Sequence, residues 1–179
     1  DRGKSGFLLS SSDVSIYDSK FNLKDENKES QPVLEFYDLN INATNFLING
    51  PDVSARINTL AFYDSRGLSV KNLITDFEYT LDHISFKNLS ISTPNSTLNG
   101  NVRFDFKRED FKDFEDKVQI TARFNNADIL LDELNTFYNE FGTNQRAELT
   151  VDLSGTLNNL SVNNLNLTSS TNTIVKGDL

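Results

Sequence analysis

The residues of this chain that could do chemistry are few, and the first is His83, the only histidine. A Ser-His-Asp triad would have to use it, yet no Gly-x-Ser-x-Gly motif exposes a nucleophilic serine. The absence of cysteine excludes disulfides, thiol catalysis and thiolate metal sites. One histidine cannot build a multi-histidine zinc site, and the eight glycines form no phosphate-binding loop. We therefore expect no enzyme, no metal site and no cofactor, and we interpret His83 as a turn residue.

The second candidate for chemistry is a run of carboxylates in the segment Lys107–Lys117. Paired carboxylates can serve as general acid and base. Here they alternate with lysine and arginine, which is typical of a solvated surface. We therefore predict a connection with at most one helical turn. The carboxylates are Glu109, Asp110, Asp113, Glu115 and Asp116.

The elements that would position any site are strands, and a six-residue repeat organises them. It occurs at 68–73, 84–89 and 160–165, with apolar residues at its first, third and sixth positions. Alternate residues of a strand face one side, so the slip between the third and sixth positions requires an extra residue to bulge out. We predict a β-bulge or a sharp bend at the asparagine of each copy.

The last two copies lie about 76 residues apart, and each is followed by a similar sequence that predicts a polar turn and then another strand. This spacing indicates duplication of a multi-strand unit, with repeats around 67–106 and 146–179, so an array is favoured over a closed globule. Short turns between successive strands predict an antiparallel meander. At the amino-terminal end we predict two short strands, at 7–9 and 14–23, joined by a hairpin turn at 10–13. Residues 67–81 read as one long strand.

One helix is predicted, from Asp132 to Phe141. Leu134, Phe137, Tyr138 and Phe141 form an apolar stripe, with Asp132 as N-cap and Gly142 after the carboxyl end. Three turns are marginal alone in water, so the helix must dock, and we expect it at an open end of the sheet.

Composition excludes several partner classes. The formal net charge of −9 argues against nucleic acid and against electrostatic docking on an anionic bilayer. No apolar run approaches the roughly 20 residues of a spanning helix. The chain contains no methionine, so we expect that residues 1–179 are a segment of a longer polypeptide.

Three stretches together resemble the TamB translocation and assembly module of the AsmA-like superfamily, in its Bacteroidetes-type form. They are 67–73, 87–100 (Lys-Asn-Leu-Ser-Ile-Ser-Thr-Pro-Asn-Ser-Thr-Leu-Asn-Gly) and 131–138. The resemblance implies a mainly β fold, an antiparallel meander curled into an open β-groove with an apolar lining. It also implies a non-enzymatic periplasmic bridge, anchored in the inner membrane by a segment outside residues 1–179. Its implied partners are phospholipid acyl chains and, through parts outside this segment, a BamA-like or TamA-like outer-membrane barrel.

If the sheet is curled, the apolar side chains would line its inner face and shelter acyl chains, whereas Asn, Ser and Thr would keep the outer face soluble. The candidate lining residues are Phe62, Leu68, Val70, Phe77, Tyr79, Ile84, Phe86, Val102, Phe104, Ile120, Phe124, Leu149 and Val151. Across the bulges, sequence alone does not determine which residues face inward.

Two other interpretations stay open. The same apolar residues could pack on one another in a filled sandwich or solenoid core. The chain would then be an extracellular or surface β-repeat module with a structural or adhesive role.

Overall fold

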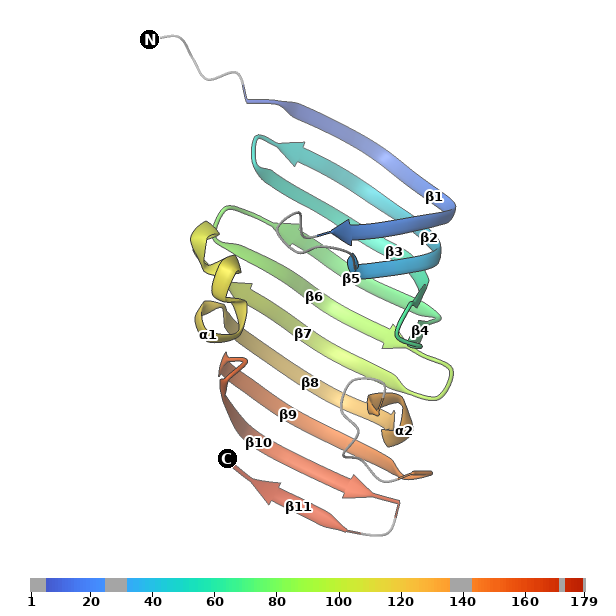
Figure 1. Ribbon diagram of the computed structural model, residues 1–179, viewed down its shortest axis with the longest axis vertical. Coiled ribbons are helices and arrows are strands. Elements are labelled where there is room, and N and C mark those ends of the chain that lie inside the picture. Colours follow the sequence, from blue (N-terminus) through green and yellow to red (C-terminus); the bar gives the residue numbers. More distant parts are fainter. Residues whose placement is uncertain (1–5, 25–31, 136–142, 171–172, 179) are drawn as a thin grey trace.

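The computed structural model describes residues 6–24, 32–135, 143–170 and 173–178. They form one open antiparallel sheet of 11 strands, which is not closed into a barrel (Figure 1). The order follows the chain as β1-β2-β3-β5-β6-β7-β8-β9-β10-β11, and β4 pairs with β3. The mainly β, antiparallel meander predicted from the sequence is therefore confirmed. The strands are β1 (Leu8–Lys24), β2 (Pro32–Asn49), β3 (Asp52–Asp64), β4 (Ser69–Val70), β5 (Asn72–Tyr79), β6 (His83–Ser92), β7 (Thr97–Asp105), β8 (Gln119–Leu130), β9 (Arg146–Thr156), β10 (Asn159–Ser169) and β11 (Ile174–Gly177).

The hairpin predicted at the amino-terminal end is wrong. Residues 10–13 lie inside β1, where Ser10 pairs with Leu47 and Asp13 with Thr44. The long neighbouring strand β2 offers backbone partners on both sides of Ser12, and that pairing outweighs the local turn preference of the serines. The single strand predicted for 67–81 is also interrupted, because Lys71 separates β4 from β5.

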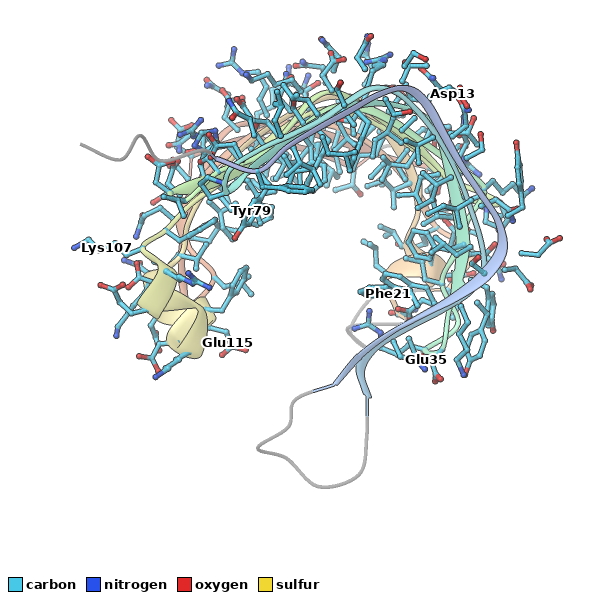
Figure 2. All side chains as sticks on the ribbon, turned by 90° about the horizontal axis from the view of Figure 1, so that it is seen from above. Asp13, Phe21, Glu35, Tyr79, Lys107 and Glu115 are labelled. Atoms are coloured by element: carbon cyan, nitrogen blue, oxygen red, sulfur yellow. The ribbon has the colours of Figure 1, made fainter. Side chains whose placement is uncertain are left out.

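The sheet is curled into an arch (Figure 2). Asparagine bulges interrupt several of its strands. Asn88 and Asn164 have φ of 51° and 52°, and the register shifts beside each of them. The bulges predicted in the second and third repeat copies are confirmed, and the first copy has the break at Lys71 instead. Asn126 of β8 adopts the same conformation, with φ of 54°.

Asparagine suits these positions because its short polar side chain tolerates the left-handed region better than most residues. Because each bulge adds one residue, the apolar residues after it face the same side of the sheet as those before it. Phe86 and Leu89 of β6 are one such pair, with register partners Val102 and Gly100 on β7. The sheet can therefore bend and keep one continuous apolar face.

Short helices lie at both ends of the strands (Figure 1). The connection after β7 forms a 3-10 helix, η1 (Arg108–Asp113), followed by α1 (Phe114–Lys117), and is more helical than predicted. After β8, α2 covers Leu131–Leu134, so Asp132 lies inside the helix and Leu130 is the N-cap residue. Residues 136–142 of the predicted helix lie outside the described residues.

Because the sheet is a single layer, few of its large apolar side chains are fully buried. Four of the ten buried apolar residues are alanines, Ala43, Ala122, Ala127 and Ala147, and most of the large apolar side chains are half-buried. Within the described residues no second sheet covers the apolar face, so that face remains partly accessible.

Candidate functional site

The register assigns the two faces of the sheet. Phe77 of β5 pairs with Phe86 of β6, which pairs with Val102 of β7. The neighbouring row runs from Tyr79 through Ile84. Residues paired in register lie on one side of a sheet, and residues two apart share that side. Figure 2 shows Tyr79 pointing into the hollow of the arch, so this apolar face is the concave one.

The structure brings the predicted lining residues together on this face. Phe104 and Ile120 continue the row of Tyr79 and Ile84. Gly100, Phe124 and Val151 form another row of register partners. Leu149 lies two residues before Val151 on β9 and therefore faces the same side. Phe62 of β3 pairs with Val70 of β4. Leu68 comes two residues before Val70 in the sequence. The thirteen residues therefore belong to one concave surface, which we call the groove: Phe62, Leu68, Val70, Phe77, Tyr79, Ile84, Phe86, Val102, Phe104, Ile120, Phe124, Leu149 and Val151.

Aromatic rings form a continuous wall on one arm of the groove. The ring centroids of Phe77 and Phe86 are 5.4 Å apart, and those of Phe86 and Phe104 are 6.5 Å apart with edge-on geometry. Phe114 of α1 extends the wall, 6.1 Å from Phe104. These separations are typical of favourable aromatic pairs. All four rings remain half-buried.

Sequence analysis missed several aromatic residues that contribute to the groove. Phe36 lies 5.8 Å from Phe21 and 4.4 Å from Phe62. Phe21 lies on the arm of the arch opposite Tyr79 (Figure 2). Phe106 lies 6.5 Å from Tyr79. In β1 and β2 the signal was present as alternation, but the left-handed residues Asp18 and Asp38 break the parity. Phe106 continues the alternation of Val102 and Phe104 just beyond the end of β7, so its signal was present in the sequence.

The convex face is polar and repeats one network at the bend. Arg56 pairs with Asp76 at 2.9 Å, and the Asn88 amide donates to the same carboxylate at 2.7 Å. The hydrogen bonds from Asn88 and Arg56 lower the pKa of Asp76. About 76 residues later, Asp152 accepts from Arg123 at 2.7 Å and from Asn164 at 2.8 Å. These bonds hold the bend from its outer side.

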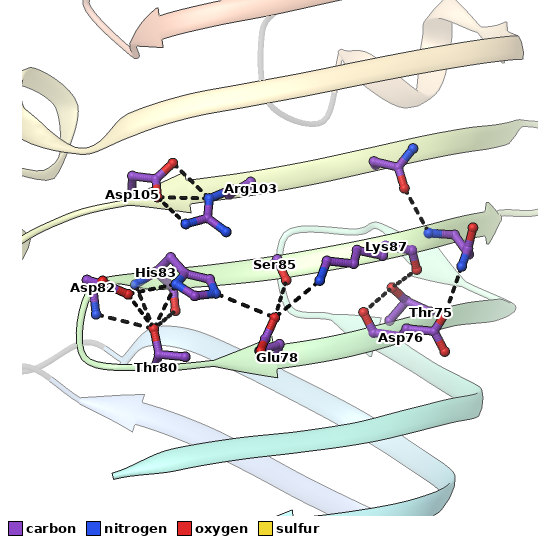
Figure 3. Close-up of polar contacts among 12 residues, drawn as sticks. Thr75, Asp76, Glu78, Thr80, Asp82, His83, Ser85, Lys87, Arg103 and Asp105 are labelled. Carbon is purple, nitrogen blue, oxygen red and sulfur yellow. Dashed lines mark hydrogen bonds and ion pairs between the residues drawn. The ribbon is translucent and has the colours of Figure 1, made fainter.

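His83 lies at the edge of this polar face (Figure 3). Its Nδ1 lies 2.7 Å from Asp82 Oδ1 and 2.8 Å from Thr80 Oγ1, and its Nε2 lies 3.5 Å from Glu78 Oε2. Ser85 is buried and donates to Glu78, not to His83. Hydrogen bonds from Lys87 and then His83 lower the pKa of Glu78. This geometry closes the β5–β6 turn and presents no serine to the histidine.

Three of the five carboxylates in 107–117 have structural partners. Asp113 pairs with Lys117 at 2.7 Å, and Asp110 accepts from the Lys107 backbone N–H at 2.7 Å. Asp116 accepts from the Asn158 amide at 2.9 Å, which ties α1 to the β9–β10 turn. The segment therefore caps one end of the groove wall.

Glu133 of α2 fastens the opposite end. Its carboxylate accepts from Thr93 Oγ1 at 2.5 Å, from Ser96 Oγ, and from the Asn95 backbone N–H at 3.1 Å. Ser96 Oγ also accepts from the Leu130 N–H at 2.9 Å. Burial raises the pKa of the Glu133 carboxyl, but the hydrogen bonds outweigh it and leave the pKa below its usual value. Four polar groups of the β6–β7 turn are thus satisfied by one side chain.

We expect Glu133→Gln to lower the free energy of unfolding by about 1–2 kcal/mol at pH 7, because charge-assisted hydrogen bonds become neutral ones. A carboxyl with a depressed folded-state pKa stabilises the fold above its unfolded pKa of about 4.3, and this contribution disappears as pH falls through the folded pKa. Urea unfolding at pH 7 and pH 3 should therefore show a difference between wild type and variant that shrinks in acid. Glu109→Gln, at an exposed site, is the control. A difference independent of pH would contradict this role of Glu133.

Among the described residues no helix is long and apolar enough to cross a bilayer. The same part of the chain contains no group of three or more acidic or histidine residues placed to hold a metal ion. No protein-family model, curated protein or solved structure matches this chain. The groove is therefore the feature on which a function can be argued.

Proposed function

We propose that this chain is a non-enzymatic segment of a periplasmic bridge between the inner and outer membranes. Its groove shelters phospholipid acyl chains for lipid transport, for support of outer-membrane protein assembly, or for both. One observation carries the proposal: the concave face is apolar, and no further layer of the described residues covers it. Most of its lining side chains are half-buried, whereas Val70, Ile120 and Val151 are buried among their neighbours. The periplasmic location, the inner-membrane anchor and the outer-membrane barrel partner rest on the resemblance to the TamB family.

The energetics suit a conduit. Each buried CH₂ gains about 0.8 kcal/mol, so a sixteen-carbon chain gains roughly 12 kcal/mol before ordering costs. A membrane offers nearly the same shelter, so a lipid can enter and leave without a large free-energy difference. A groove with water on one side satisfies this condition better than a closed pocket.

The dimensions suit acyl chains as well. Neighbouring strands lie about 4.8 Å apart, so the sheet from β1 to β11 extends roughly 40 Å along the groove. One leaflet of bilayer hydrocarbon is about 15 Å deep. A lipid tail can therefore lie lengthwise across several strands, against the aromatic wall of Phe77, Phe86 and Phe104.

Photo-crosslinking tests the proposal. A photoreactive residue at Phe104 should label phospholipid that copurifies with the chain, detected by lipid extraction and mass spectrometry. Thr121 is the matched control, because it is exposed on the convex side of β8, next to the register partner of Phe104. A lipid-free chain, or equal lipid labelling from both positions, would count against the groove as the lipid site.

A further inference from the structure

Three cationic side chains from adjacent strands meet on the convex face. Lys87 belongs to β6, Arg103 to β7 and Arg123 to β8, and Figure 3 shows the first two on neighbouring strands. Arg123 lies opposite Asn101, which is two residues from Arg103, so the two arginine Cβ atoms are diagonal neighbours roughly 7–8 Å apart. Positive charge is therefore concentrated at one place on a chain whose formal net charge is −9.

The three cations line one hollow, whose lining contains no carboxylate. The hollow has a volume of about 250 Å³, and its other lining residues are Ser85, Asn101, Val102 and Thr121. The neighbouring hollows differ in charge. One is lined by Asp76 and Glu78, and another by Asp128 and Glu148. The hollow around Arg103 therefore has the composition of an anion site, and the other two do not.

Both guanidinium groups have N–H donors to spare. Arg123 donates from Nε and Nη2 to the Asp152 carboxylate, at 2.7 and 3.1 Å. Arg103 donates from Nε to Asp105 at 2.8 Å, and its Nη2 lies 2.7 Å from the same carboxylate. Within the part of the chain that the structure describes, the Nη1 group of each arginine makes no hydrogen bond. Each Nη1 group can therefore donate to a bound anion while its ion pair stays in place.

The third cation is also only partly used. The Lys87 ammonium has three N–H donors, and its hydrogen bond is to Glu78, at 3.3 Å. The carboxylates that pair with the three cations all lie outside the lining of the hollow. They hold the two guanidinium groups in fixed orientations, which lowers the entropy that these side chains would lose when a ligand binds.

We propose that this hollow binds the phosphate group of a soluble phosphate monoester. The phosphate oxygens accept from Arg103 Nη1, Arg123 Nη1 and Lys87 Nζ. Arginine suits phosphate because its planar fork matches the spacing of two oxygens, and the tetrahedral group offers a further oxygen to the lysine. A planar carboxylate has only two oxygens for the three cations.

The location of the hollow excludes a phospholipid held in the groove as the source of the phosphate. Lys87, Arg103 and Arg123 lie on the convex face, whereas acyl chains would lie on the concave one. A bilayer surface is also a poor source, because the net charge of the chain is repelled by anionic lipids. The ligand is therefore a small molecule in solution.

The test is a titration of the ¹⁵N-labelled chain with glycerol 3-phosphate at low ionic strength, followed by NMR. We expect saturable shifts of the backbone amide signals of Asn101, Arg103 and Arg123. Arg123→Gln should weaken binding by roughly tenfold, because a charge-assisted hydrogen bond is lost. Lys87→Gln should weaken it in the same direction, and acetate should bind more weakly than glycerol 3-phosphate to the wild-type chain.

Arg56→Gln is the matched control. Arg56 pairs with Asp76 at 2.9 Å, as Arg123 pairs with Asp152, but it lies outside the lining of the hollow. Glycerol 3-phosphate should therefore bind this variant with wild-type affinity. The same spectra show whether each variant keeps the wild-type fold.

Four outcomes would overturn the proposal. They are the absence of saturable shifts, equal weakening by Arg56→Gln and Arg123→Gln, and equal affinities for acetate and glycerol 3-phosphate. The fourth is cosedimentation with phosphatidic acid vesicles that is lost in Arg123→Gln, since the phosphate would then belong to a membrane lipid. Lipid is absent from the titration, so its result is independent of the proposed lipid function.

Discussion

Gly100→Ala is expected to destabilise the fold by about 3 kcal/mol, a large share of the roughly 5–15 kcal/mol by which folded domains are stable. The added Cβ would lie 2.2 Å from the Arg123 carbonyl oxygen of β8 and 2.8 Å from the Phe124 ring. The first contact is with backbone, so rotation of a side chain cannot relieve it, and β7 and β8 must separate. Urea unfolding followed by far-UV circular dichroism measures the loss.

Gly6→Ala is the control, since a Cβ there would meet its nearest atom, the Gly50 Cα, at 3.9 Å, which is ordinary contact. This variant should unfold at nearly the wild-type urea concentration. Equal stabilities for Gly100→Ala and wild type would mean that β7 and β8 do not approach as closely as the bend requires.

The bend itself could be predicted from sequence. In the copies at 84–89 and 160–165 the apolar spacing slips by one at an asparagine, and a strand can absorb such a slip through a bulge. Asn88 and Asn164 adopt that conformation. The order of strands followed equally from short polar turns, which leave antiparallel neighbours as the simplest connection.

The amino-terminal strands could not be predicted from local text. Ser10 to Asp13 has turn chemistry, but β1 runs through it because β2 supplies partners along most of its length. Whether residues 10–13 form a turn or a strand depends on their pairing with residues that are distant in the sequence. A short window of sequence holds no information on that pairing. The helix α2 shows the same limit on a smaller scale, because its Glu133 is tied to the β6–β7 turn, nearly 40 residues earlier.

The lining of the groove was predictable as a set of residues but not as a face. Alternation within each strand identifies which side chains share a side, and Phe77 and Tyr79 are an example. Each left-handed residue resets this parity, so the relation between neighbouring segments had to come from the register. Phe21 and Phe36 were missed for that reason, since Asp18 and Asp38 interrupt their strands.

Phe104→Asp is expected to reduce the phospholipid that copurifies with the chain by about tenfold or more. The ring of Phe104 stands between those of Phe86 and Phe114, and an acyl chain lying along this wall would bury whatever side chain replaces it. Burying an ionised carboxylate without a partner costs far more than the 1.4 kcal/mol that corresponds to tenfold in affinity. Lipid extraction with quantitative mass spectrometry measures the loss.

The decisive comparison is between Phe104→Asp on the concave face and Thr121→Asp on the convex face, because both variants add the same charge. Thr121→Asp places the same carboxylate on the convex side, where its register partner is Arg103, so lipid loading should stay at the wild-type level. Phe104→Leu keeps an apolar surface and should retain most of the lipid even if the aromatic contacts are lost. Circular dichroism must show that all three variants keep their strand signal, because an unfolded chain would lose lipid for a different reason. Should folded Phe104→Asp carry as much lipid as folded Thr121→Asp, the acyl chains would not lie on the concave face, and the apolar groove would need another occupant.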